Sequence, residues 1–302
     1  MHVVNYDVSK DNVEEVLFSN LDCRWFHYPH KKLDSGKSLI DLARYNKKAY
    51  EDLIFLANNG YYIYNVKENN ITSFVHHSAI HKTWNRISNG EFCIEDSLVY
   101  SFTEPLLKNF DTNLLVIFSS ISGEMYQPYL FRYFEQNFSS IQKHISPNTA
   151  ILRIADMGGV TGAYYLNTNY MIDNEIKIQK LIKKISNKID AKKTILFGIS
   201  KGGSGALYHG IMGNYNFLAV DPIVDDEFYL TKCNDLHFVR EIFKETKKIK
   251  FNRIIENLNY SDLNNGCIIC SPRSEQYPYI SSLLFDKCAN IFPFLVVFQK
   301  VC

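Results

Sequence analysis

One stretch of the sequence, residues 194–206, limits what the chain can fold into more than any other. Apolar and β-branched residues lead into Gly-Ile-Ser-Lys-Gly at 198–202, and a run suited to a helix follows at 206–212. This order of strand, sharp turn and helix is typical of a nucleophile elbow, in which a strained turn exposes a serine hydroxyl at the start of a helix. We therefore predict that Ser200 is a nucleophile.

The residues around Ser200 fit the geometry of such a turn. Gly198 and Gly202 stand where a side chain would collide with a neighbouring strand or helix. The amide of Lys201 is expected to face a developing oxyanion, and its side chain either attracts an anionic substrate or is an exposed lysine at the helix start. A glycine-rich turn that holds a phosphate or only packs tightly is the alternative, although the spacing fits neither a Walker A loop nor a dinucleotide fingerprint.

Length and charge exclude several classes of protein. The chain has 302 residues and a formal net charge of +1, so no electrostatic feature points to a nucleic-acid partner. No apolar run approaches the roughly 18 residues of a membrane span, and the segment from Met1 to Lys10 holds no apolar signal core. We therefore expect a cytoplasmic protein without a transmembrane segment.

Neither a metal site nor a cofactor is expected. The seven cysteines are scattered through apolar segments, which indicates reduced core thiols rather than disulfides. Cys267 and Cys270 form a Cys-x-x-Cys pair with no second pair beside it, and His76, His77 and His81 make only a weak metal motif.

The first 110 residues differ from the rest in their pattern. Residues 38–58 carry apolar positions at helical spacing. Short segments with the pattern of strands, separated by Asn and Gly turns, lie at 61–66, 71–75, 91–94 and 98–102. We interpret residues 1–110 as an N-terminal accessory region of mixed α+β structure, packed against a main domain at 111–302.

From residue 111 onward, strands alternate with helices, as a doubly wound, mostly parallel sheet requires. The predicted strands lie at 114–118, 150–155, 194–197, 217–220, 267–270 and 294–298. An aromatic helix is expected at 129–138 and an amphipathic helix at 174–189. The pattern as a whole predicts an α/β-hydrolase-like fold.

In such a sheet the functional residues follow the carboxyl ends of the strands. The turn after the first of these strands normally supplies the second backbone amide that binds the oxyanion. Here Ser120 or Ile121 is expected to supply that amide. Glu275 is the favoured catalytic acid and Asp221 the second candidate. Either carboxylate would otherwise cap a helix or pair with Arg273.

The catalytic base is the part of the pattern that the sequence does not complete. In this fold a histidine normally follows the last strand, and none of the nine histidines lies after Phe298. His209 is expected to point to the far side of the elbow helix, whereas an insertion that acts as a lid would bring His237 over the site. Three explanations stay open: the chain lacks its natural C-terminus, which we favour slightly, the base comes from an insertion, or the site is not hydrolytic.

Three segments resemble a known family: Arg-Ile-Ala-Asp-Met-Gly-Gly at 153–159, Gly-Ala-Tyr-Tyr-Leu-Asn-Thr at 162–168 and Gly-Ile-Ser-Lys-Gly-Gly at 198–203. The central part of the chain resembles capsular polysaccharide biosynthesis proteins of the XcbB/CpsF kind, which are similar to the α/β-hydrolase-like component of bacterial accessory Sec systems. The resemblance implies a bacterial cytoplasmic protein at the periphery of a membrane-associated capsule assembly. Its expected partners are a carbohydrate polymer, an activated sugar or acyl donor, and capsule-assembly proteins.

Residues near the elbow are candidates to hold such a carbohydrate. Arg153 is a candidate substrate-binding residue, or else it pairs with Asp156 and shapes the following loop. Tyrosines that would stack on sugar rings, or equally well pack in the core, are Tyr126, Tyr129, Tyr164 and Tyr165.

Two hypotheses about function follow. The first is a serine-dependent acyltransferase or esterase that acts on a capsule-type glycan. The second is a catalytically silent subunit with a hydrolase-like fold, which binds glycan or a glycosyltransferase partner.

Overall fold

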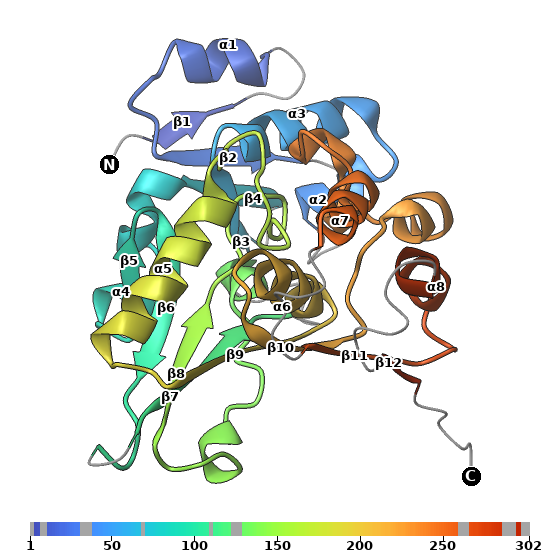
Figure 1. Ribbon diagram of the computed structural model, residues 1–302. Helices are drawn as coiled ribbons and strands as arrows, with labels where there is room; N and C mark the ends of the chain where they lie inside the picture. The colour runs from blue at the N-terminus through green and yellow to red at the C-terminus, as the bar shows by residue number, and fades with distance from the viewer. Residues whose placement is uncertain are drawn as a thin grey trace, which may run out of the picture.

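A computed structural model describes residues 3–6, 11–30, 38–67, 70–108, 111–121, 129–258, 266–285 and 294–296. These residues form a small four-stranded sheet with its own helices and a larger eight-stranded sheet (Figure 1). Among the described helices, none is both long and apolar enough to cross a membrane.

The small sheet has the strand order β1-β2-β4-β3. Its strands are β1 (Val3–Asn5), β2 (Trp25–Pro29), β3 (Tyr61–Lys67) and β4 (Ile71–His76), and its helices are α1 (Val13–Phe18), α2 (Leu39–Ala43) and α3 (Lys47–Asn58). The predicted strands β3 and β4 are confirmed, whereas β1 and β2 were not predicted. The single helix predicted at 38–58 is two helices, because the Asn46 side chain accepts a hydrogen bond from the amide of Ala49 and starts a new helix.

The large sheet has the order β12-β11-β10-β9-β7-β8-β6-β5. Its strands are β5 (Cys93–Glu95), β6 (Leu98–Thr103), β7 (Asn113–Phe118), β8 (Thr149–Ile154), β9 (Lys193–Ile199), β10 (Asn216–Val220), β11 (Gly266–Cys270) and β12 (Phe294–Val296). The strands from β7 to β12 pair in parallel, and the β5–β6 hairpin joins β8 in the antiparallel sense. All six strands predicted after residue 111 are present, so the mostly parallel sheet is confirmed.

The β5–β6 hairpin lies before residue 110, where the domain boundary is predicted, and its two strands belong to the large sheet. A short alternating strand has the same pattern in either sheet, and its sequence does not tell which sheet it joins.

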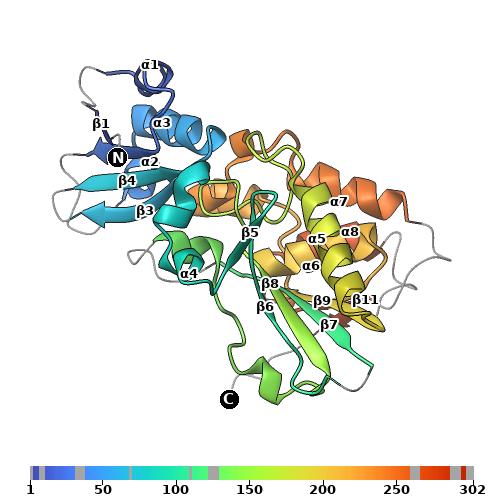
Figure 2. The same cartoon turned by 90° about the vertical axis from the view of Figure 1, so that its left-hand side faces the viewer.

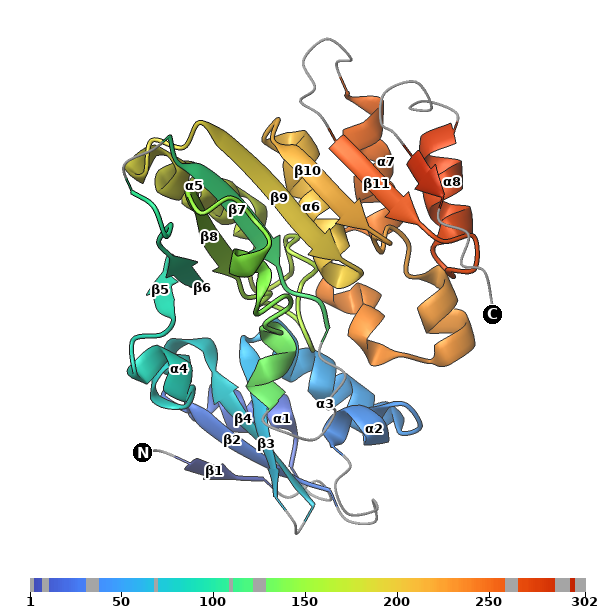
Figure 3. The same ribbon diagram turned by 90° about the horizontal axis from the view of Figure 1, so that it is seen from below.

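The helices of the large sheet are α5 (Asn174–Lys188), α6 (Lys201–Met212), α7 (Lys247–Glu256) and α8 (Tyr277–Phe285). Figures 1 and 3 show these four helices on one face of the sheet. On the other face, Leu115, Ile117 and Ile151 pack against Ile141 and Ile145 from the chain between β7 and β8. The described helices therefore do not show the predicted doubly wound arrangement, and the helix predicted at 129–138 is only a 3-10 turn at Tyr129–Tyr133.

The two sheets lie next to each other (Figure 2), and aromatic side chains pack between the N-terminal region and the rest of the chain. The rings of Tyr62 in β3 and Tyr133 lie 5.0 Å apart at a steep angle. Gly60 leaves room for the ring of Tyr170, which a Cβ atom at that position would approach within 2.3 Å. The N-terminal region thus packs directly against the segments that surround the carboxyl end of the large sheet.

Candidate functional site

Ser200 lies on a strained turn between β9 and α6. Its φ of 53° and ψ of −120° place it in a left-handed region that residues other than glycine seldom adopt. The Ser200 amide donates to the carbonyl of Val220 at 2.9 Å, which fixes the turn to the end of β10. The side chain is half-buried, and its hydroxyl has no hydrogen-bond partner in the described part of the chain. This geometry leaves the hydroxyl available at the N-terminus of a helix.

Two glycines make the turn possible. A Cβ atom on Gly198 would lie 2.0 Å from the carbonyl oxygen of Gly202, and one on Gly202 would lie 2.2 Å from that of Phe118. The predicted collisions with the following helix and the neighbouring strand are therefore confirmed. The close approach also brings the chain after β7 against the start of α6.

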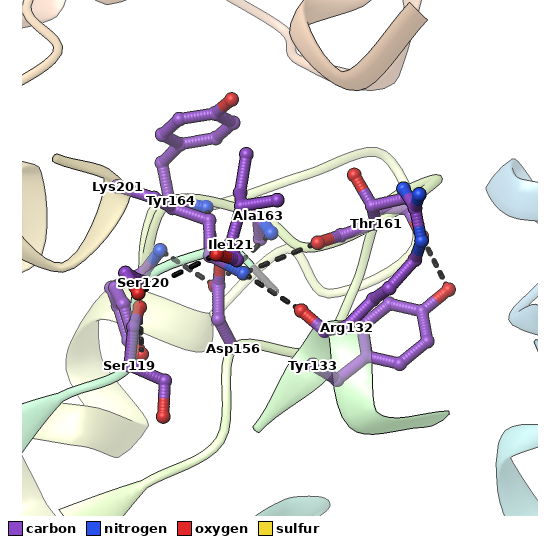
Figure 4. A network of polar contacts seen from close by, with 12 residues as sticks. Ser119, Ser120, Ile121, Arg132, Tyr133, Asp156, Thr161, Ala163, Tyr164 and Lys201 are labelled. Carbon is purple, nitrogen blue, oxygen red and sulfur yellow. Dashed lines mark hydrogen bonds and ion pairs between the residues drawn. The ribbon is translucent and has the colours of Figure 1, made fainter. Parts of the chain in front are cut away.

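The Lys201 side chain does not face solvent or a substrate. It is fully buried, and its Nζ lies 3.1 Å from Oδ2 of Asp156, which is also fully buried. The same Nζ donates to the carbonyl oxygens of Arg132 and Thr161, each at 3.2 Å (Figure 4). Burial lowers the pKa of Lys201, and the Asp156 carboxylate opposes that change. Both interpretations of this side chain, as an attractor of anions and as an exposed lysine, are wrong.

Asp156 also organises the loop that follows β8. Its two carboxylate oxygens accept hydrogen bonds from the amides of Ala163, Tyr164 and Tyr165 at 2.9–3.0 Å. Tyr164 and Tyr165 have φ values of 55° and 62°, so the carboxylate holds this loop in a left-handed turn. The predicted pair between Asp156 and Arg153 is replaced by the pair with Lys201.

The residues predicted to hold a substrate are buried. Tyr164 is 1% exposed and Tyr165 is not exposed at all, so neither ring can stack on a sugar in this conformation. Arg153 is 6% exposed, and its guanidinium donates to the carbonyl of Phe138 at 3.2 Å. Burial lowers the pKa of Arg153. Tyr126 and the side chain of Tyr129 lie outside the described residues.

The amides predicted for the oxyanion differ in their availability. The Lys201 amide opens α6 and has no acceptor within the helix, as at every helix start. The Ser120 amide already donates to the side-chain oxygen of Asn137 at 2.8 Å. The Ile121 amide has no acceptor among the described residues. Of the two candidates, it is therefore the amide that is available to bind an oxyanion together with the Lys201 amide.

The two candidate acids lie at the ends of neighbouring strands. Asp221 directly follows β10, beside the carbonyl that holds Ser200, and its carboxylate accepts a hydrogen bond from the Cys270 thiol at 3.0 Å. Glu275 is exposed, and its carboxylate accepts a hydrogen bond from the hydroxyl of Tyr229. Neither acid contacts a histidine within the described ranges, and the predicted alternative pair with Arg273 is not formed there.

His237 forms a pair with Asp235, an acid that was not predicted from the sequence. Its Nδ1 lies 2.6 Å from Oδ1 of Asp235, and its Nε2 contacts the guanidinium of Arg132. Burial lowers the pKa of His237, although Asp235 opposes the change. In the described part of the chain, no hydrogen bond connects His237 to Ser200. The Asp-x-His spacing at 235–237 is the signal that could have identified this pair.

The other histidines have structural surroundings. His209 is fully buried in α6, where its ring bonds to the side chain of Gln179 and the carbonyl of Tyr165. Burial lowers the pKa of His209 to about 4. The described residues contain no group of three or more potential metal ligands, so His76, His77 and His81 form no metal site there.

A cavity of about 710 Å³ lies away from the elbow. It opens between the start of α5, the end of α6 and α7, and no residue predicted for the catalytic site lines it. Ser200 and this cavity are therefore separate features of the molecule.

Comparisons with known proteins show similarity at the level of the fold. Neither the models of known protein families nor the sequences of curated proteins give a match. The solved capsule O-acetyltransferase of Neisseria meningitidis serogroup A is 18% identical, with a TM-score of 0.50 over 69% of this chain and 86% of that chain. A mutant of the same acetyltransferase in complex with CoA is 16% identical, with a TM-score of 0.51 and the same coverage of 69% and 86%.

A third similar structure is the glycosylation-associated protein complex Gap123 from Streptococcus agalactiae. It is 17% identical, with a TM-score of 0.50 over 68% of this chain and 41% of that chain. At these identities the likeness concerns the fold alone. The chain therefore shares the fold of these proteins over about two thirds of its length.

Proposed function

We propose that the protein is a serine-dependent enzyme that transfers an acyl group to a glycan or hydrolyses an ester on it. The observation that carries the proposal is Ser200, a non-glycine residue held at φ 53° at the start of a helix with its hydroxyl free among the described residues. Such strain persists only where the surrounding structure enforces it, and it clusters at catalytic sites.

The proposed reaction begins with attack of the Ser200 hydroxyl on the acyl carbonyl. The serine proton passes to a base, and the amides of Lys201 and Ile121 stabilise the oxyanion. Collapse of the tetrahedral species expels the donor's leaving group and leaves an acyl-enzyme. A sugar hydroxyl or water then takes the acyl group and restores the serine.

His237 is the proposed base, and Asp235 is the acid that orients it. Asp235 holds Nδ1, so the neutral ring presents Nε2 as the proton acceptor. Because Nε2 contacts Arg132 here, His237 acts only if the Arg132 side chain moves away from it. Asp221 and Glu275 stay as candidate acids for a base that approaches from another direction.

Two observations support a glycan as the substrate class. The chain shares its fold with a capsule O-acetyltransferase and with a glycosylation-associated protein. The segments at 153–159, 162–168 and 198–203 also resemble capsular polysaccharide biosynthesis proteins of the XcbB/CpsF kind. We therefore place the protein in the synthesis of a bacterial capsule or another cell-surface polysaccharide.

A second candidate function has its own support. No histidine bonds to Ser200, Asp221 or Glu275 in the described part of the chain. This favours a catalytically silent subunit that binds glycan or a glycosyltransferase partner. In that case the strained turn would be an inherited feature of the fold.

Turnover of p-nitrophenyl acetate distinguishes the two. We expect hydrolysis by the natural protein and a loss of about 10³-fold or more in Ser200→Ala. Ser140→Ala, which alters an exposed serine far along the chain from the elbow, is the matched control and should retain full activity. Equal rates for the two variants would support the silent subunit.

A further inference from the structure

The cavity between α5, α6 and α7 continues into a second hollow. A cavity of about 380 Å³ shares Glu175, Tyr208 and Met212 with the cavity of about 710 Å³. The three helices lie side by side in Figure 2. The two cavities together form an elongated depression, which we call the α5–α7 groove.

The groove carries an excess of positive charge. Five cationic side chains and two carboxylates line it. Both carboxylates are already neutralised, Glu175 by Lys250 and Glu245 by Arg253. Lys180, Lys183 and Lys244 are exposed and form no ion pair with any described residue. Three cations that form no ion pair among the described residues, placed around one concave surface, favour an anionic ligand.

The neutral part of the lining fits a carbohydrate. Asn167, Asn214 and Asn257 line the larger cavity, and a side-chain amide can donate and accept hydrogen bonds as a sugar hydroxyl does. The Asn167 oxygen already accepts a hydrogen bond from the amide of Glu175, which leaves its NH2 group as the donor. Exposed apolar side chains suited to the C–H faces of sugar rings lie at the same surface: Ile172 (59% exposed), Ile176 (58%) and Met212 (56%). A carboxylate-rich peptide would form ion pairs with the cations, but it would make less use of the amides and the exposed apolar side chains.

The groove lies too far from the elbow to hold the reacting group. Tyr208 and Met212 are 8 to 12 residues after Ser200 on α6, which corresponds to about 12–18 Å along the helix axis. A ligand in the groove would therefore be bound by a part that does not react.

We propose that the α5–α7 groove binds an anionic segment of the glycan chain, one or more sugar units away from the unit at Ser200. The choice of a glycan rests on the proposed function, whereas the requirement for negative charge rests on the groove itself. The groove would hold the polymer while different units reach the elbow.

Binding of a fluorescent oligogalacturonate, followed by anisotropy, tests the inference. Lys180→Glu/Lys183→Glu reverses two groove charges on α5. Lys143→Glu/Lys193→Glu is the matched control, because it reverses two exposed charges outside the groove. We expect binding that weakens with salt, a loss of about tenfold or more in the groove variant, and a change of less than about twofold in the control.

Three results would overturn the inference. The first is an equal affinity for oligogalacturonate in the groove variant and the control variant, and the second is binding of neutral dextran as tight as that of oligogalacturonate. The third is binding of polyglutamate as tight as that of oligogalacturonate, with the same dependence on Lys180 and Lys183. The last result would mark a surface for acidic proteins. Ser200→Ala should bind the oligosaccharide as the natural protein does. If binding depends on the groove but Ser200 is unreactive, the proposed catalysis is rejected and the groove as a glycan-binding site is supported. If Ser200 is reactive but binding does not depend on the groove, the catalysis is supported and the groove is rejected.

Discussion

Nζ of Lys201 lies 3.1 Å from Oδ2 of Asp156, with both side chains completely removed from solvent. Lys201 is the first residue of the elbow helix, and Asp156 lies two residues after the end of β8. Because Asp156 also accepts three backbone amides, the pair joins the elbow, the end of β8 and the loop at 163–165 into one unit. The position of Ser200 therefore depends on a buried charge pair beside it.

Removal of one member of this pair should be costly. Lys201→Met leaves the Asp156 carboxylate buried without its cation, and we expect the free energy of unfolding to fall by about 3–5 kcal/mol. Lys177→Met is the control, since Lys177 pairs with Asp173 at a partly exposed site on α5. That change should cost less than about 1 kcal/mol. Urea denaturation measures both, and a similar small loss for each would show that the buried pair contributes little.

Backbone strain at Ser200 predicts that the serine needed for catalysis lowers the stability of the folded protein. With φ at 53° and ψ at −120°, the position suits glycine better than any residue with a Cβ atom. We expect Ser200→Gly to be about 1 kcal/mol more stable than Ser200→Ala, although neither has a nucleophile. Thermal and urea unfolding of the two variants give this difference. A less stable glycine variant would mean that the turn is not strained.

Gly202 should tolerate no side chain. In the middle of an unconstrained helix, Gly→Ala usually stabilises by about 1 kcal/mol. Here the new Cβ would lie 2.2 Å from the carbonyl oxygen of Phe118, so we expect Gly202→Ala to lose about 3 kcal/mol or more. Gly90→Ala is the comparison, because its φ is +81° but no atom lies within 4 Å of the new Cβ. Its cost should be about 1 kcal/mol from the backbone alone. A stabilising Gly202→Ala would contradict the close contact of β7 and α6.

The turn at Ser200 was predictable because its geometry depends on local sequence. A strand, two glycines around a serine and a helix are encoded within about one dozen residues, and each glycine has a single steric cause. The strands of the large sheet were predictable for a similar reason, since buried parallel strands are continuous apolar runs.

Long-range pairings were not predictable in this way. No local pattern tells that Lys201 turns inward to Asp156, 45 residues earlier in the sequence, rather than outward to solvent. The burial of Tyr164 and Tyr165 likewise depends on segments that pack on them from elsewhere, such as Phe238 on Tyr164. Which sheet the β5–β6 hairpin joins is likewise determined by tertiary contacts and not by its local sequence.

A fall in pH should destabilise the folded protein, partly because of the buried His209. Burial lowers the pKa of this residue to about 4. The unfolded chain binds a proton near pH 6.5 and the folded chain does not, so the contribution of His209 is complete above pH 6.5 and falls by about 3 kcal/mol as the pH drops to 4. We expect His209→Gln to be less stable at pH 7 but to lose less stability between pH 6.5 and 4.5 than the natural protein.

The exposed His81 provides the control for this pH dependence. His77, whose pKa burial also lowers to about 4, keeps part of the slope of stability against pH in both His209→Gln and His81→Gln. An identical slope for His209→Gln and the natural protein would show that His209 is not held neutral.

Reaction with a fluorophosphonate, followed by intact-mass analysis, tests the central claim most directly. An activated Ser200 predicts a single adduct on the natural protein and on Ser140→Ala, and none on a folded Ser200→Ala. An unlabelled natural protein, or an adduct that persists in Ser200→Ala, would contradict the account of Ser200 as a nucleophile.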